Sequence, residues 1–382
     1  MGAFTKLFSR LRITSDPNVA TQTSAVIQAD SGNTNLVIAP SGTGALVAQI
    51  PDGTTTGGNS RGTYATDLQK QRSANTQVAS GIYSVIGGGL NNTASDEYAV
   101  VAGGSGNTAS GRRSFVGGGI GNTAGAIFNN SVIGGSGNTS TGGEAIAGGF
   151  SSVASGSRSV AFGLSGTASG GGSFAMAGTA SGLGATAFSG GNASNDYIFA
   201  HGDFAVSGLY GSLTKANGRF PNSVISNNGL AQTHSVIARR EAALTSGATA
   251  VLSLDGTGTT NFIGITSNTA VQGGAYSYRI NYVAIVIAIS GTATGVTIGD
   301  VKTQNIEIGA KSVNNLPAVS VGAGSYSIAQ EDASMNSASL TPSIGAGPSL
   351  QLTFTSPTYA GGGTVTYRVV AQVQIVEVRY GT

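Results

Sequence analysis

The residues that could take part in acid–base chemistry or bind a metal ion are few. The 382-residue chain has two histidines and no cysteine. His201 lies between Asp196 and Asp203, and imidazole beside carboxylates is a combination that serves metal binding and proton transfer. We favour a structural role for this group, in which its polar side chains close the last of a series of repeats. His234 stands alone before a strand, and we interpret it as a surface or turn residue.

Two adjacent acidic pairs, Asp96-Glu97 and Glu331-Asp332, are the other candidates for chemistry. Two carboxylates about 5 to 10 Å apart can hydrolyse a glycosidic bond. Neighbours on a strand point to opposite faces, however, and neighbours in a turn usually face water. We therefore predict no catalytic residue, no metal ligand and no cofactor, and a protein that is not an enzyme.

Other motifs also favour structural interpretations. The glycine runs at 87–89 and 117–119 lack the Lys-Ser/Thr that follows in a phosphate-binding loop. The repeats contain almost no aspartate, which argues against a calcium-binding β-roll. Arg112-Arg113 is the densest basic pair in the repeats, and the net charge is only +2, so nucleic-acid binding is not expected.

A set of threonines recurs once per repeat and would form a ladder on one flank: Thr93, Thr108, Thr123, Thr139, Thr167 and Thr179. A flat threonine array could bind ice or glycans. We favour the simpler interpretation that the threonines and nearby asparagines satisfy backbone groups at corners.

Aromatic side chains give two further patterns near the ends of the chain. Tyr276 and Tyr278 alternate with polar residues, as in a half-buried strand, and we assign them to a core rather than to a receptor contact. Near the N-terminus, Phe4, Leu7, Phe8 and Leu11 have helical spacing. That segment could anchor the protein to a larger assembly or become ordered only on binding.

The composition indicates a folded, charge-poor protein. Charged residues make up 9% and hydrophobic residues 40%, which is the opposite of a disordered chain. The absence of cysteine excludes disulfides, and it weakly favours a protein that folds in a reducing cytosol. The first twelve residues lack the apolar run of a secretory signal, and the longest apolar stretch, Tyr282–Ile289, is too short to span a membrane. We expect neither export nor membrane insertion.

Internal repeats dominate the middle of the chain. From residue 81 the units read GIYSVIGGGLNNTAS, DEYAVVAGGSGNTAS and GRRSFVGGGIGNTAG, and the series ends near Gly208. The equivalent positions are taken as Ser84, Ala99, Ser114, Ser131, Ala145, Ser159 and Ser173, with steps of 15, 15, 17, 14, 14 and 14 residues. Short strands joined by glycine-rich corners at this period predict a solenoid with thin turns.

The strands of the repeats are apolar at consecutive positions, as in Val85-Ile86 and Val100-Val101. Consecutive apolar positions indicate a strand that is covered on both faces. One face can fill the interior of the roll, but a turn this thin cannot bury the other alone. We therefore predict that the roll folds only as part of an obligate oligomer.

The repeats resemble the head repeats of trimeric autotransporter adhesins, most closely at SVAFGLSGTASG, residues 159–170. That resemblance covers about residues 81–208 and implies a left-handed parallel β-roll with three chains around one axis. Those adhesins also carry a signal peptide, a heptad stalk and a membrane anchor, none of which we identify here. The same repeats occur in phage fibre and virion-surface proteins. Residues 52–81 and 365–378 also resemble segments of phage tail and fibre proteins.

We therefore expect a structural protein of a bacteriophage virion, a homotrimeric fibre, spike or capsid-surface appendage that is assembled in the host cytoplasm. Its N-terminal region would bind other virion proteins, and its C-terminal domain would contact a host surface glycan or protein. Three alternatives stay open: a capsid decoration protein without a receptor role, a fragment of a bacterial trimeric adhesin, and a polysaccharide-degrading tailspike.

The predicted fold is all-β and has four parts. Residues 1–80 form a small β-rich attachment and capping region, 81–208 the repeat β-roll, 209–234 a linker or neck, and 235–382 a β-sandwich or jelly-roll-like domain. In the last part we predict strands at 236–238, 248–254, 262–266, 275–289, 295–298, 305–308, 325–329, 350–355 and 364–378.

Overall fold

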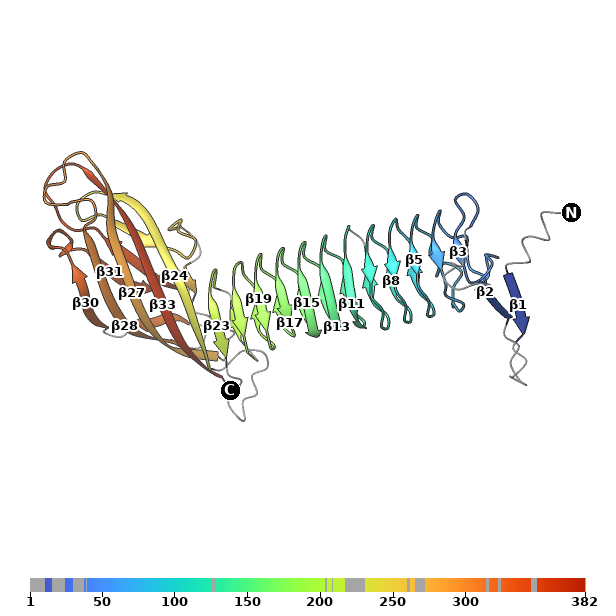
Figure 1. Cartoon of the computed structure of the whole chain (residues 1–382). Coiled ribbons are helices and arrows are strands. Elements are labelled where there is room, and N and C mark those ends of the chain that lie inside the picture. The colour runs from blue at the N-terminus through green and yellow to red at the C-terminus, as the bar shows by residue number, and fades with distance from the viewer. Residues whose placement is uncertain are drawn as a thin grey trace.

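The computed structural model is all-β, with a long solenoid in the middle and an antiparallel region at the C-terminal end (Figure 1). It describes residues 11–15, 25–29, 38, 40–125, 128–202, 205–207, 209–216, 231–259, 262–264, 272–313, 316–321, 324–344 and 349–381. The only helix in these ranges is the short 3₁₀ turn η1 (Ala333–Met335). The predicted fold class, with a β-roll followed by an antiparallel C-terminal domain, is confirmed.

The solenoid consists of two parallel sheets whose strands follow one another along the axis. The first solenoid sheet runs through β3 (Leu46–Val47), β4 (Thr66–Asp67), β5 (Val85–Ile86), β7 (Val100–Val101), β9 (Phe115–Val116), β11 (Ser131–Ser136), β13 (Ile146–Phe150), β15 (Val160–Leu164), β17 (Phe174–Met176), β19 (Thr186–Phe188), β21 (Phe199–His201) and β23 (Leu213–Ala216). The second solenoid sheet contains β6 (Thr93–Ala94), β8 (Thr108–Ala109), β10 (Thr123–Ala124), β12 (Thr139–Ser140), β14 (Val153–Ala154), β16 (Thr167–Ala168), β18 (Thr179–Ala180), β20 (Asn192–Ala193) and β22 (Val206–Ser207).

The register of the rungs corrects one step of the sequence alignment. Phe115 pairs with Ser131, and Ser131 pairs with Ile146, so the residue equivalent to Ser114 is Asn130 and not Ser131. The steps around this rung are therefore 16 and 15 residues rather than 17 and 14. The error arose because both neighbours of the strand start are polar, and the extra residue lies in the preceding corner, where no side-chain pattern marks it.

The interior of the solenoid is filled by small side chains. Alanines at equivalent positions of successive rungs are fully buried, together with a few larger residues in the early rungs such as Ile86 and Val116. Beside them runs a buried ladder of asparagines: Asn92, Asn107, Asn122 and Asn138. Each side-chain oxygen accepts the next rung's backbone N–H at 2.9–3.0 Å. Each side-chain nitrogen donates to glycine carbonyl oxygens of its own and the next rung.

The asparagine ladder thus satisfies the corner backbone from inside the roll, as predicted for these residues. We expect Asn122→Ala to lower the free energy of unfolding by at least about 2 kcal/mol, because it removes the acceptor of the buried Asn138 N–H and the side-chain donor to the Gly118 carbonyl. Thr123→Ala, on the outer side of the same rung, is the control and should change it by less than about 0.5 kcal/mol. Equal effects of the two substitutions in urea unfolding would contradict a stabilising ladder.

The solenoid begins before the predicted boundary at residue 81 and ends after that at 208, since β3, β4 and β23 belong to its first sheet. At the N-terminal end, buried Asp67 accepts a hydrogen bond from Arg61 Nε at 2.8 Å and lies 3.8 Å from Arg72 Nη2. Burial, followed by the charge of Arg61, lowers the pKa of Arg72. Gln69 then bonds both backbone groups of Asn92 and starts the ladder, so this part of the chain caps the first rung.

The strand pair that precedes the solenoid is a separate small element. β1 (Leu11–Ser15) pairs antiparallel with β2 (Ala25–Ala29). Leu11, the last residue of the apolar series that was predicted to be helical, begins β1, and the other members of that series lie outside the described residues.

The C-terminal region is built from two antiparallel sheets that share one core. In the long sheet, β33 (Thr364–Gly381) lies between β24 (Ala231–Leu244) and β27 (Gln272–Ser290). β27 pairs on its other side with β28 (Val301–Val313), which also pairs with β29 (Leu316–Val321) and β30 (Ser325–Glu331). The smaller sheet contains β25 (Thr249–Leu252), β26 (Ile263–Gly264), β31 (Ser339–Ile344) and β32 (Ser349–Thr355). The rings of Phe354 and Tyr367 meet between the sheets at 5.3 Å.

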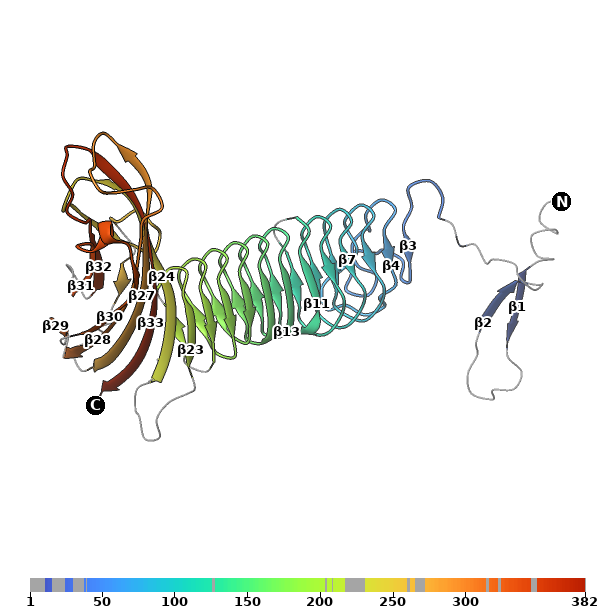
Figure 2. The same cartoon turned by 60° about the vertical axis from the view of Figure 1, so that its left-hand side comes forward.

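The solenoid passes directly into the long sheet, because β24 pairs antiparallel with β23 (Figure 2). The predicted linker at 209–234 therefore contains strand residues at both of its ends, and 217–230 lie outside the described residues. The predicted strand at 295–298 is wrong. Gly295 and Gly299 have positive φ angles of 88° and 100°, and Thr297 N–H donates to Asp300 Oδ2 within a loop.

Candidate functional site

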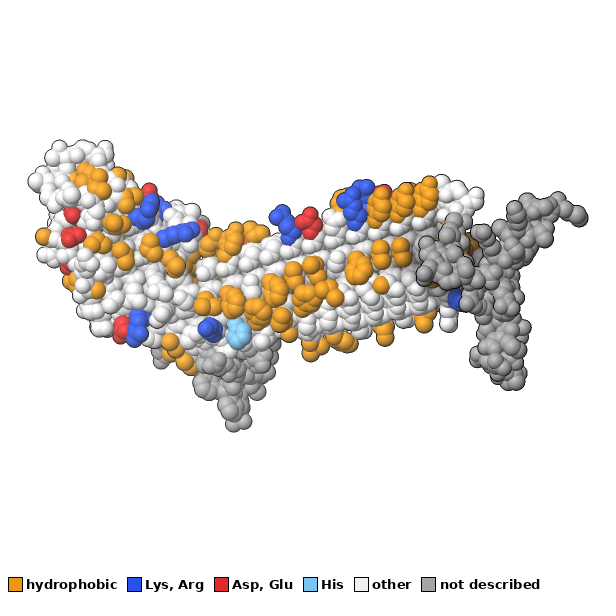
Figure 3. All heavy atoms as spheres, viewed as in Figure 1, with side chains coloured by type: hydrophobic (Ala, Val, Ile, Leu, Met, Phe, Trp, Pro, Cys, Tyr) orange, Lys and Arg blue, Asp and Glu red, His pale blue; other side chains and the backbone are white. Residues whose placement is uncertain are grey.

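The largest feature of the solenoid surface is an apolar face on the outer side of the first solenoid sheet. Figure 3 shows hydrophobic side chains in rows along the solenoid. The apolar face consists of Val85, Val100, Phe115, Ile133, Ile146, Val160, Phe162, Phe174, Met176, Phe188, Phe199 and Leu213. Ile133 is 59% exposed, Met176 44% and Leu213 40%. Phe188 packs against Phe174 and Phe199, with ring centroids 5.5 Å apart in both pairs.

The outer side of the second solenoid sheet is polar and uncharged. Its strands place the predicted threonines in register, with Thr93, Thr108, Thr123 and Thr139 in one series and Thr167 and Thr179 continuing it. Val153 interrupts the series between Thr139 and Thr167. The threonine ladder is therefore present, and the two long sides of the solenoid differ completely in chemistry.

The charged side chains of the repeats gather in one corner. We call the turn that precedes each strand of the first solenoid sheet the first corner. It holds Asp96, Glu97, Arg112, Arg113, Glu144, Arg158 and Asp196. One residue of each first corner has a positive φ of about 56–65°, for example Tyr98, Arg113 and Glu144. These are conformations that glycine adopts with less strain, and Gly172 and Gly184 occupy the equivalent positions in later rungs.

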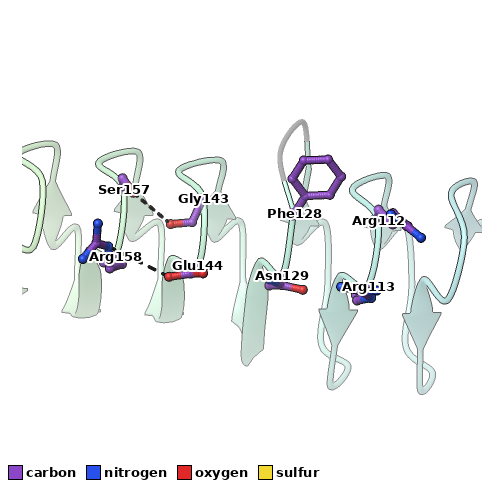
Figure 4. A pocket seen from close by; sticks show the side chains of 8 residues that line it. All are labelled: Arg112, Arg113, Phe128, Asn129, Gly143, Glu144, Ser157 and Arg158. Carbon is purple, nitrogen blue, oxygen red and sulfur yellow. Dashed lines mark hydrogen bonds and ion pairs between the residues drawn. The ribbon is translucent and has the colours of Figure 1, made fainter.

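The first corner forms an open hollow of about 720 Å³ around Arg112, Arg113, Phe128, Glu144 and Arg158 (Figure 4). Arg112 Nε lies 2.7 Å from Glu97 Oε2, and Arg158 Nε lies 3.9 Å from Glu144 Oε2. Both of these ion pairs are substantially exposed, so each contributes little to stability. The arginine pair thus lies on a solvated edge, as predicted.

The two acidic pairs do not form a paired-carboxylate site. Asp96 Oδ1 accepts the backbone N–H of Glu97 at 2.7 Å, and Glu97 contacts Arg112. Glu331 contacts the buried ammonium of Lys302 at 3.3 Å. Asp332 Oδ2 accepts the backbone N–H of Val301 at 2.7 Å. Each of these four carboxylates therefore has a local structural partner.

The two described members of the His201 group, His201 and Asp196, are not brought together at a metal site. His201 is exposed on β21, with its ring 6.4 Å from the ring of Phe188. Asp196 accepts the backbone N–H of Leu183 in the first corner at 2.8 Å. Asp203 lies outside the described residues. Within the described ranges, no cluster of three or more His, Asp or Glu side chains could hold a metal ion.

The prediction that His234 is a surface or turn residue is wrong. His234 lies inside β24 and is only 7% exposed. Its Nδ1 lies 2.9 Å from the Thr214 hydroxyl, and its Nε2 lies 2.9 Å from Glu377 Oε2. Gln232 Nε2 donates to the same carboxylate oxygen at 2.6 Å. No local sequence pattern marks this cluster, because Glu377 follows His234 by 143 residues and only the pairing of β24 with β33 brings them together.

The order hydroxyl, imidazole, carboxylate has the composition of a catalytic triad, but the geometry supports a structural role. Thr214 is fully buried in the last rung and Glu377 is 2% exposed, so the hydroxyl has no access to a substrate. The cluster connects β23, β24 and β33. It is a polar junction that holds the end of the solenoid against the C-terminal sheet.

Tyr276 and Tyr278 belong to the core, as predicted. They are 6% and 1% exposed, and both lie on the inner side of β27. Burial, with smaller effects from the charges of Tyr276 and Glu377, raises the pKa of Tyr278. Strand register places Tyr276 opposite Glu377 of the polar junction.

We expect Glu377→Ala to lower the free energy of unfolding by about 3 kcal/mol, because Gln232 and His234 lose their acceptor in a buried site. Gln374→Ala changes an exposed, outward-facing side chain of the same strand and is the control. Hydrogen exchange should become faster in β23 and β24 of the Glu377 variant alone. Equal exchange in the two variants would show that the junction does not hold these strands together.

Comparison with known proteins gives only distant likenesses. No family model matches the chain, and no curated protein sequence matches it. Two solved structures show a distant structural likeness. They are phage tailspikes. The tailspike protein of Acinetobacter phage vB_ApiP_P1 has 12% identity and a TM-score of 0.23, with 78% of this chain and 51% of that chain covered. The tailspike protein of Acinetobacter baumannii phage AM24 has 11% identity and a TM-score of 0.21, with 83% of this chain and 56% of that chain covered.

This chain thus spans about half the length of the tailspike chains that it matches. Identities and TM-scores this low leave the assignment of a function to the surfaces of the chain itself. Among the described residues there is also no helix with the length and apolar character of a membrane span.

Proposed function

We propose that the chain is a structural protein of a bacteriophage virion, a homotrimeric fibre, spike or capsid-surface appendage that displays its C-terminal domain for attachment to a host. In this proposal the N-terminal region binds other virion proteins, the solenoid is a rigid spacer, and the C-terminal domain contacts the host surface. Three copies of that domain would raise the avidity of attachment through effective concentration.

The observation that carries the proposal is the exposed apolar face of the solenoid. It continues through successive rungs, and rungs of a parallel sheet are spaced by about 4.8 Å, so the nine steps from β5 to β23 extend it over about 43 Å. Contiguous apolar patches of this length mark protein–protein contacts. The charged side chains of the repeats lie in the first corner. Among the described strands of the first solenoid sheet, only the last rung carries an exposed charge on the outer side, at Lys215 beside His201. This distribution favours burial of the face against further copies with the first corner in solvent.

A structural rather than enzymatic role is supported by the placement of the acidic residues and histidines. The two acidic pairs bind neighbouring backbone and side-chain groups, and the hydroxyl of the buried junction has no access to solvent. We therefore propose that the protein is not an enzyme. Incubation of the purified protein with host polysaccharide should leave the polymer length unchanged, and shortening of the polymer would overturn this part of the proposal.

The trimer can be tested with two lysine substitutions in one rung. Met176 lies in the apolar face between Phe162 and Phe188, and Thr179 lies on the polar side. We expect Met176→Lys to abolish the trimer in sedimentation velocity, because it buries an unpaired charge between copies. Thr179→Lys should sediment as the unmodified protein does. A Met176→Lys variant that keeps the trimer would exclude this face as the contact between copies.

The location on the virion is tested by electron microscopy of purified particles with the protein labelled. We expect label on the particle, at the tail or on the capsid. Purified trimer should also compete with particles for adsorption to host cells, because it presents the same C-terminal domains. Label on no particle would contradict the virion role, and absence of competition would contradict the attachment role.

A further inference from the structure

The end of the C-terminal region farthest from the solenoid carries a groove between three loops. The loops follow β27, surround η1 and precede β33. We call it the tip groove and define it by Thr294, Ser334, Asn336, Ser337, Thr358 and Tyr359, which line a volume of about 630 Å³. Nothing in the proposed mode of assembly uses these residues.

Strand register places the tip groove away from the proposed contact between copies. Ser235 and Gln374 pair beside β23, whereas Leu244 pairs with Val365 at the other end of the same strands. The nine residue steps from Ser235 to Leu244 span about 30 Å. Figure 1 shows these loops at the end of the long sheet opposite β23. The groove is therefore open to a partner when the solenoids are assembled.

The three loops are tied to one another, so the groove is preformed. Thr294 N–H donates to the Ala360 carbonyl at 2.8 Å, which joins the first loop to the third. The Ser337 hydroxyl lies 3.1 Å from the Thr358 hydroxyl and accepts the Thr358 N–H at 2.8 Å, which joins the second loop to the third. The Ser334 hydroxyl donates to Asp300 and so joins the second loop to the first. A groove fixed in this way loses little conformational entropy when a ligand binds.

One wall of the tip groove is an aromatic ring in a fixed orientation. The Tyr359 hydroxyl lies 2.9 Å from the Leu244 carbonyl oxygen and 3.2 Å from that of Gly363. The Tyr359 N–H donates to Ser246 at 2.9 Å. Held at both its backbone and its hydroxyl, the ring offers a rigid apolar surface beside the hydroxyl and amide groups of the other loops.

The lining contains no charged side chain, and its composition is that of adaptable binding loops. Tyrosine supplies contact area at low entropic cost, and serine, threonine and asparagine supply hydrogen-bond donors and acceptors. The exposed groups are those of Thr294, Asn336, Ser337 and Thr358. The Tyr367 hydroxyl, which does not line the groove, is buried without a hydrogen-bond partner among the described residues. Burial, followed by the charges of Tyr359 and Asp300, raises the pKa of Tyr367 and keeps this hydroxyl a donor.

We propose that the tip groove binds a neutral saccharide. The hydroxyl and amide side chains would bond the sugar hydroxyls, and the apolar face of a sugar ring would pack on Tyr359. A neutral sugar fits better than an acidic one, because no arginine or lysine lines the groove to pair with a carboxylate or phosphate. This inference rests on the proposed attachment role and assigns it a ligand class and a place.

The test uses the full-length assembled protein on an array of neutral and acidic oligosaccharides. Asn336→Trp fills the groove from an exposed side chain, and Thr341→Trp changes an exposed residue of β31 outside it. The unmodified protein and the Thr341 variant should bind neutral saccharides, and the Asn336 variant should bind them at least tenfold more weakly. Asn336→Asp should also weaken binding, because it removes the amide donor without adding bulk. Urea unfolding of each variant verifies the fold.

Three results would overturn the inference: no neutral saccharide bound by the unmodified protein, binding of acidic saccharides only, or equal affinity of the Asn336 and Thr341 tryptophan variants. A failure of the saccharide assignment is distinguished from a failure of the attachment role by measuring whether the purified protein competes with particles for adsorption to host cells. If the purified protein competes with particles for host cells but binds no neutral saccharide, attachment stands and the saccharide assignment falls. If it does not compete, the attachment role falls as well.

Discussion

The narrow interior of the solenoid is the constraint on which the rest of the structure depends. Most rungs have only two-residue strands in the second solenoid sheet, and the space between the two sheets is filled by alanine and by the asparagine ladder. Large side chains such as Phe162 and Phe188 have no room inside and project outwards from the first solenoid sheet. A chain with 40% hydrophobic residues therefore exposes an apolar face, and a partner is needed to remove it from water.

The first corner shows how the same constraint orders the surface. Residues such as Tyr83 and Arg113 occupy left-handed conformations that cost about 1 kcal/mol or more for a side chain with a Cβ atom. Part of this cost is offset where Tyr64, Tyr83 and Tyr98 stack, with ring centroids 5.0 and 5.2 Å apart. In the following rungs the corner carries the charged side chains instead. The solenoid thus has one apolar side, one hydroxyl-rich side and one edge that carries the charged side chains of the repeats. Further apolar side chains, such as Ile120, Phe150 and Leu164, are exposed at or after the ends of the strands of the first solenoid sheet.

Local regularity determined what could be predicted from the sequence. The repeat, the parallel strands, the threonine ladder and the corner role of the asparagines follow from periods of about 14 residues. The shift from Ser131 to Asn130 could not be seen, because one inserted corner residue changes register without changing composition. The burial of His234 depended on a partner 143 residues away. β31 was missed because Pro342 lies within it, and proline usually marks a strand edge or a turn. The tip groove required three loops to converge, which no pattern within one segment records.

The central claim is that copies of this chain bury the apolar face around a common axis. It is tested most directly by the mass of the unmodified, folded protein in solution, measured by sedimentation equilibrium over a wide range of dilution. The account predicts a mass of three chains that persists on dilution, with unfolding and dissociation occurring together. A stably folded species with the 37.5 kDa mass of one chain would contradict it.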